Sequence, residues 1–154
     1  MNIKIEKAKI DDWKIIQHLN NQVFVSEAKH DDDLVVDYAF SESGINYYKK
    51  LTSGKYGNCV IAYDDDKAVG YVAMSLKDFG YRKSMYVEVE NMGVDPDYRS
   101  QGIGHLLIEE VRKWAISQNA TKLYVEAYFK NNKALNFYKR EGFGEIGLEM
   151  DMTI

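Results

Sequence analysis

Residues 91–104 read Asn91-Met92-Gly93-Val94-Asp95-Pro96-Asp97-Tyr98-Arg99-Ser100-Gln101-Gly102-Ile103-Gly104, and this stretch decides how the chain folds. It begins as a strand, turns at Pro96, and passes through a glycine-bearing loop into an amphipathic helix. A helix that starts after such a loop presents unpaired backbone N–H groups and the positive end of its dipole at one point. This arrangement predicts a phosphate site.

Two common nucleotide-binding motifs do not match this loop. A Walker A loop requires a lysine directly after its second glycine, and none stands there. A dinucleotide fingerprint requires a third glycine where this chain has Leu107. The pattern that remains is Arg99-x-x-Gly102-x-Gly104, in which the glycines admit a ligand close to the backbone and Arg99 adds a charge-assisted donor. On spacing alone, an ordinary strand–loop–helix connection explains the pattern equally well.

Composition predicts one soluble domain over residues 1–154. The chain is 45% hydrophobic and 29% charged, with a formal net charge of −4. The lack of a basic surplus argues against a nucleic-acid partner. Cys59 is the only cysteine, so neither an intramolecular disulfide nor a cysteine-based zinc site is possible, and no metal is expected. No run resembles a signal peptide or a membrane span, and we expect a cytoplasmic protein without membrane contact.

Hydrophobic periodicity predicts a mixed α/β (α+β) fold. Strands are expected near residues 2–8, 57–63, 68–76, 84–94, 122–127 and 143–153. Helices are expected after Asp11 or Asp12 and over residues 43–51, 102–117 and 132–141. The strand–helix–strand crossover from residue 84 to residue 127 should join two parallel strands.

The loop Arg99-Ser100-Gln101-Gly102-Ile103-Gly104 resembles the acetyl-CoA pyrophosphate loop of the GCN5-related N-acetyltransferases (GNAT). A second segment, Asn131-Asn132-Lys133-Ala134-Leu135-Asn136-Phe137-Tyr138-Lys139-Arg140-Glu141-Gly142-Phe143, is similar to the family's Asn-x-x-Ala-x-x-x-Tyr-x-x-x-Gly-Phe pattern. The resemblance is specific from about Ser84 to Phe143, whereas the front half matches mainly in element order. It implies a GNAT-like three-layer fold with a mixed central sheet of about six to seven strands. A splay between the strands at 84–94 and 122–127 and about four flanking helices are also implied.

The resemblance also implies an activity. The chain should be an acetyl-CoA-dependent N-acetyltransferase in which a primary amine attacks the thioester directly in a ternary complex. Acetyl-CoA is then a co-substrate. Its pantetheine arm should pair with Met92, Gly93 and Val94, and its pyrophosphate should be held by Arg99, Ser100, Gln101, Gly102, Ile103 and Gly104. Asn131 should contact the CoA arm or order the turn that does, although an asparagine at this position is equally typical of a helix N-cap.

Three residues are the expected catalytic groups. The resemblance assigns Tyr138 as the proton donor to the leaving thiolate, and a phenol of pKa near 10 suits a thiol of pKa near 8.5. The acceptor amine must lose a proton before it attacks, and a carboxylate is the natural base. Glu90 and Glu126 are the two candidates, from strands that should face each other across the splay; Glu88 is a weaker third.

The acceptor itself stays open. In this family the first two helices and their loop determine it, and here that region carries Glu27, His30, several aspartates, Tyr47 and Tyr48. An acidic, aromatic rim would suit a small cationic amine, an aminoglycoside, a polyamine or a peptide amine; a solvated charged loop explains it as well. A non-catalytic CoA-binding regulatory or interaction module is the alternative function. The alternating apolar residues of the predicted last strand make a homodimer possible.

Overall fold

A computed structural model describes residues 1–154. Its strands form one mixed sheet in the order β1-β2-β3-β4-β5. The first four strands are antiparallel neighbours, and β5 runs parallel to β4. The strands are β1 (Ile3–Lys7), β2 (Asn58–Asp64), β3 (Lys67–Lys77), β4 (Tyr86–Val94) and β5 (Lys122–Val125). The helices are α1 (Trp13–Glu27), α2 (Glu42–Thr52), α3 (Ile103–Ser117) and α4 (Asn132–Arg140). The predicted mixed fold, hairpin and parallel crossover are confirmed.

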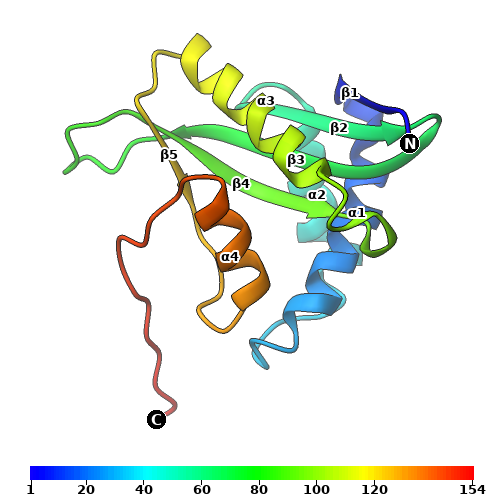
Figure 1. Ribbon diagram of the computed structural model, residues 1–154. Helices are drawn as coiled ribbons and strands as arrows, with labels where there is room; N and C mark the ends of the chain where they lie inside the picture. Colours follow the sequence, from blue (N-terminus) through cyan, green and yellow to red (C-terminus); the bar gives the residue numbers. More distant parts are fainter.

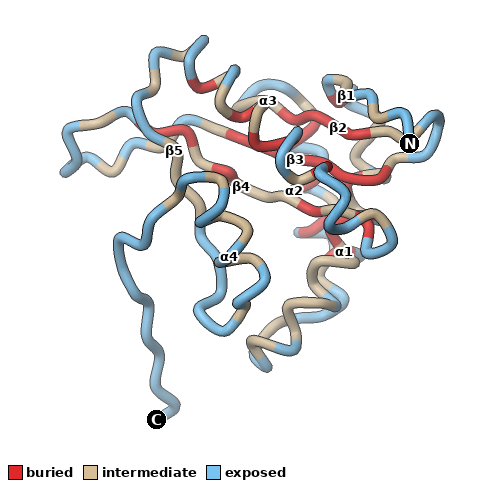
Figure 2. The backbone as a smooth tube through the Cα atoms, viewed as in Figure 1, coloured by how far each residue is buried: buried red, intermediate tan, exposed pale blue.

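Helices cover both faces of the sheet, which gives three layers (Figure 1). On one face, α3 buries Ile103, Leu107, Ile108 and Val111 against strand residues such as Val72 and Val87. On the other, α1 and α2 bury Ile16, Leu19 and Tyr48 against Ile61 and Tyr71. Alternate residues of β3 therefore serve opposite cores, as the two-residue period of a strand requires. Figure 2 shows the buried residues concentrated along the central strands and the helix faces toward them.

The two parallel strands separate halfway along β4. β5 pairs only with Tyr86–Val89, so the second half of β4, Glu90–Val94, has β3 on one side and no strand on the other. A β-bulge lies at this point, because Ala73 pairs with Asn91 and Met74 with Val89, and Glu90 is left without an opposite residue. The predicted splay is thus present, and the bulge marks where it begins.

The prediction of six to seven strands was wrong, because the sheet has five. The segment 143–153, predicted as a last strand, forms no strand, and every residue from Gly144 to Ile154 is exposed. This segment runs away from the body of the protein (Figure 1). Alternating apolar residues define a face but not a hydrogen-bonding partner, and Gly144 and Gly147 weaken the strand preference further. None of the four helices has both the length and the apolarity that a membrane crossing requires.

Candidate active site

The loop before α3 has the geometry of an anion site. Gly102 adopts φ +87° directly before the helix, a left-handed conformation that glycine tolerates best. The first helical hydrogen bond joins the Leu106 N–H to the Gly102 carbonyl at 3.1 Å. The amides of Ser100, Gln101 and Gly102 donate no hydrogen bond within the protein. A cluster of free N–H groups at a helix N-terminus is what a pyrophosphate requires.

Side chains of this loop form hydrogen bonds with the backbone of the same loop. Arg99 Nε donates to the Val94 carbonyl at 3.0 Å, and Gln101 Nε2 donates to the Asp97 carbonyl at 2.9 Å. The nearly buried Asp95 accepts the Asp97 N–H at 3.0 Å and pairs with Lys67. The turn between β4 and α3 is therefore fixed before any ligand binds, and the Arg99 side chain lies at the open end of β4.

Gly104 has a second reason to be glycine. A Cβ at this position would lie 3.0 Å from the Phe137 ring and 3.4 Å from Met92 Cε. Ligand approach was the only reason that the sequence offered. The structure adds close packing of α4 against the first turn of α3, which brings the second family-like segment beside the loop.

Tyr138 lies on α4 and is half-buried between two aromatic rings. Its centroid is 5.1 Å from that of Phe137 and 5.5 Å from that of Phe143. Burial, and secondly the negative charge of Glu27, raise the pKa of Tyr138 to about 12. The hydroxyl therefore stays protonated at any physiological pH, as a proton donor must.

Asn131 caps α4 and also reaches α1. Its Oδ1 accepts the Ala134 N–H at 3.1 Å, and its Nδ2 donates to Glu27 Oε1 at 2.7 Å. The helix-cap interpretation is therefore correct, and the contact with Glu27, 104 residues away in the sequence, is one that local sequence reasoning missed. The other carboxylate oxygen, Oε2, is buried and has no partner, and burial raises the pKa of Glu27.

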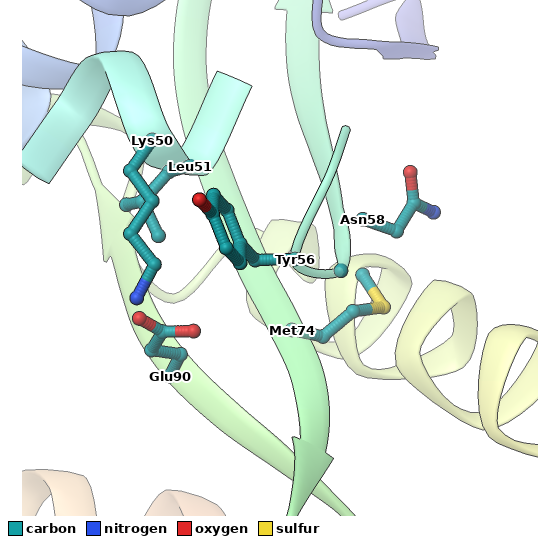
Figure 3. A pocket seen from close by; sticks show the side chains of 7 residues that line it. Lys50, Leu51, Tyr56, Asn58, Met74 and Glu90 are labelled. Carbon is teal, nitrogen blue, oxygen red and sulfur yellow. The ribbon is translucent and has the colours of Figure 1, made fainter. Parts of the chain in front are cut away.

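The two carboxylates predicted as bases lie in different surroundings. Glu126, one residue beyond β5, is exposed and accepts the Tyr124 hydroxyl at 2.7 Å, which raises the pKa of Tyr124 to about 12. Glu90, at the bulge, is half-buried and lines a cavity of about 10 Å³ beside Lys50 and Tyr56. In Figure 3 the Lys50 amine and the Glu90 carboxylate point toward one another. This cavity holds no more than a water molecule.

A network of hydrogen-bonded polar side chains lies beside the bulge. Asn91 Oδ1 accepts from Asn20 Nδ2 at 3.0 Å and from the Tyr71 hydroxyl at 2.6 Å. The Tyr48 hydroxyl donates to Asn20 Oδ1 at 2.6 Å. Tyr48, interpreted from sequence as part of an acceptor rim, is completely buried. The network connects α1, α2, β3 and β4 at Asn91, the residue that follows Glu90 in the bulge.

One cluster of acidic and histidine side chains lies on the outer side of α3. His105, Glu109 and Glu141 have ligand atoms within 4.8 Å of one another. Arg112 already forms ion pairs with both glutamates and donates to the Glu141 carbonyl. The guanidinium offsets one of the two glutamate charges, and its contacts with Glu141 join α3 to the end of α4.

Comparison with known proteins agrees with these features. The model of the acetyltransferase (GNAT) family matches residues 13–143. An uncharacterized N-acetyltransferase of Archaeoglobus fulgidus is 30% identical over 66% of this chain and 71% of its own length. The N-alpha-acetyltransferase RimI of Mycobacterium tuberculosis is 35% identical over 66% of this chain and 61% of its own. A streptothricin acetyltransferase of Escherichia coli is 27% identical over 68% of this chain and 58% of its own length.

Solved structures show the same fold. The BH1408 protein of Bacillus halodurans, as a tetramutant, superposes with a TM-score of 0.86 at 18% identity, over 98% of this chain and 99% of the other. The aminoglycoside N-acetyltransferase AAC(6')-Iy, in complex with the bisubstrate analog CoA-S-monomethyl-acetylneamine, superposes with a TM-score of 0.77 at 18% identity. The superposition covers 100% of this chain and 99% of the other. The family match over most of the chain, together with the loop before α3 and the splay beside it, leads to one conclusion: the protein belongs to the GNAT acetyltransferase family and is an N-acetyltransferase.

Proposed function

We propose that this protein transfers the acetyl group of acetyl-CoA to a primary amine by direct attack in a ternary complex. The observation that carries the proposal is the continuous path from the unpaired half of β4 to the open N-terminus of α3. The free edge at Met92, Gly93 and Val94 would take the amides of pantetheine. The amides and side chains of residues 99–104 would take the pyrophosphate.

The chemistry follows from the groups beside this path. A backbone N–H of Met92 or Gly93 would stabilise the oxyanion that forms when the amine attacks. Tyr138 would donate a proton or a hydrogen bond to the leaving thiolate. Its raised pKa keeps the hydroxyl protonated but widens the gap to the thiol pKa of about 8.5, which favours the hydrogen bond. Most of the acceleration would come from orientation of the two substrates, because no covalent enzyme intermediate is needed.

The acceptor we propose is a small cationic amine. One relative is named a streptothricin acetyltransferase, and a protein of the same fold is named an aminoglycoside N-acetyltransferase. The turn after α1 adds Asp31, Asp32 and Asp33, whose charges favour a cation. A peptide α-amine is the alternative that the similarity to RimI supports.

Tyr138→Phe tests the proposal. This variant keeps the ring that packs against Phe137 and Phe143 and removes only the hydroxyl. With acetyl-CoA and a panel of amines, we expect kcat to fall by about 10²–10³-fold while the Kd for CoA stays within twofold of wild type. CoA binding without turnover of any aminoglycoside, polyamine or peptide would contradict the enzyme and support a non-catalytic CoA-binding module.

A further inference from the structure

A second groove lies at the end of α3 away from the proposed CoA site. It is open to solvent, has a volume of about 500 Å³, and lies between the turn before β2, the end of β3 and the last turn of α3. Trp114, which lines it, is about 16 Å along the helix axis from Ile103, the first residue of α3. The groove is therefore separate from the loop before α3. Its volume falls in the range of small-molecule sites, about 300–1,000 Å³.

The walls of this groove are aromatic and apolar. Tyr56 and Leu76 are 63% and 51% exposed, and the half-buried Trp114 forms the wall on the side of α3. Large apolar side chains that gather around one groove leave apolar surface in contact with water. A flat ligand would cover this surface by stacking on the two rings.

The charged groups that line the groove are all positive. Lys7, at the end of β1, and Lys55, in the turn before β2, lie on it, and no carboxylate does. Neither ammonium group takes part in an ion pair of the protein. Two cations without a counter-ion beside an apolar surface favour an anionic ligand.

Asn58 adds a hydrogen-bond donor that has no partner. Its Oδ1 is buried and accepts no hydrogen bond, whereas its Nδ2 is not buried and donates none within the protein. In Figure 3 this amide points away from the Lys50 and Glu90 side chains. The backbone beside it is fixed, because a Cβ at Gly57 would overlap the Met74 carbonyl oxygen. An amide N–H held near two ammonium groups suits a carboxylate oxygen.

We infer that this groove binds a planar aromatic molecule that carries a carboxylate. The aromatic part stacks on Trp114 and Tyr56, and the carboxylate accepts hydrogen bonds from Lys7, Lys55 and Asn58 Nδ2. A cationic amine would meet two ammonium groups and no opposite charge. The acceptor of the proposed reaction therefore does not belong here, and binding at this groove does not require acetyl transfer.

Titration of naphthoate into the CoA-saturated protein tests this site. The chain has two tryptophans, so the spectrum of Trp13→Phe identifies the indole N–H signal of Trp114 by NMR. We expect that signal to shift saturably as naphthoate is added. Naphthamide, which has the same shape and no charge, should bind at least tenfold more weakly. An unmoved Trp114 signal, or equal affinity for the two compounds, would overturn the site.

Charge variants identify the binding groups. The double variant Lys7→Gln, Lys55→Gln changes only exposed side chains, so the fold should be kept. It should weaken naphthoate binding at least tenfold and change naphthamide binding less than twofold. The matched control is Lys29→Gln, Lys83→Gln, two exposed lysines outside the groove, and it should bind naphthoate as wild type does. Equal losses in both double variants would reduce the effect to net charge and overturn the assignment.

A second copy of the chain is the other occupant that these charges allow. The exposed C-terminal segment carries Glu149 and Asp151 between apolar residues. Sedimentation velocity of wild type and of the Lys7→Gln, Lys55→Gln variant distinguishes the two occupants. A monomer in both cases agrees with a small acid as the ligand. A wild-type dimer that dissociates in the variant would assign the groove to the partner's C-terminal segment and overturn the small-molecule site.

Discussion

Residues 1–115 and residues 116–154 are built in different ways. All 29 buried residues lie between Ala8 and Ala115, where four strands and three helices form two cores. From Ile116 onward no residue is buried, and β5 and α4 rest on the first region through half-buried side chains such as Leu123, Phe137 and Tyr138. The loop before α3, which we propose binds the pyrophosphate, belongs to the region with the buried cores, and Tyr138 belongs to the region without buried residues. The proposed site therefore lies where the two buried cores meet a segment that contributes no buried residue.

The largest effect should come from separating the two regions at Gly104. In Gly104→Val, the new side chain would enter the space of the Phe137 ring, which lies 3.0 Å from a Cβ at this position. We expect a loss of about 2 kcal/mol in the free energy of unfolding from overpacking, and loss of most acetyl transfer because α4 moves. Urea unfolding and steady-state kinetics measure the two effects.

Gly147→Val is the matched control, since nothing lies within 4 Å of a Cβ there. It should change neither quantity. A Gly104→Val variant as stable and active as wild type would show that α4 does not depend on its contact with α3.

A smaller effect is expected at the ion-pair cluster that joins α3 to α4. Arg112 pairs with Glu141, whose side chain is only 10% exposed, and also donates to the Glu141 carbonyl. Arg112→Ala should lower the free energy of unfolding by about 1 kcal/mol, since the arginine is partly exposed and the pair is screened. Thermal unfolding of Lys113→Ala, which breaks an exposed pair with Glu110, should show almost no change; equal losses in both variants would argue against a special role for Arg112.

The smallest effect is a pH dependence at Glu27. Its pKa is raised in the folded protein, so the folded state holds this proton more tightly than the unfolded chain does. Stability contributed by Glu27 is therefore greatest at low pH and is lost as pH rises through the titration of the group. Glu27→Gln, which cannot ionise, should resist urea better than wild type at pH 7.5. The difference should shrink below pH 4.5, the ordinary pKa of a glutamate. A difference that does not depend on pH would contradict burial of the charge.

The sequence predicted the part of the molecule whose structure is local. The strand, loop and helix from residue 84 to residue 117 follow from periodicity and from glycines at positions where the backbone needs them, and the parallel partner follows from the crossover. The features missed depend on side chains that are distant in the chain. Asn20 and Asn91 meet across 71 positions, and Glu27 and Asn131 across 104. The two-residue alternation of a strand also does not predict the bulge at Glu90, because the bulge inserts one extra residue into that alternation.

The last predicted strand failed for a related reason. Ile146, Leu148, Met150 and Met152 alternate as a strand would, but all four are exposed and no backbone hydrogen bond joins them to β5. Periodicity describes which side of a segment is apolar and does not specify a partner. Dimerisation through this segment stays a prediction.

Residue-resolved hydrogen exchange with and without CoA tests most directly the claim that the ligand site spans both regions. We predict slower exchange at three places on adding CoA: the free edge of β4 at residues 92–94, the loop and first turn of α3 at residues 99–106, and α4 at residues 132–138. The β2–β3 hairpin should change little. Protection confined to the hairpin, or absent from either the loop or α4, would contradict a CoA site formed jointly by the scaffold and the C-terminal segment.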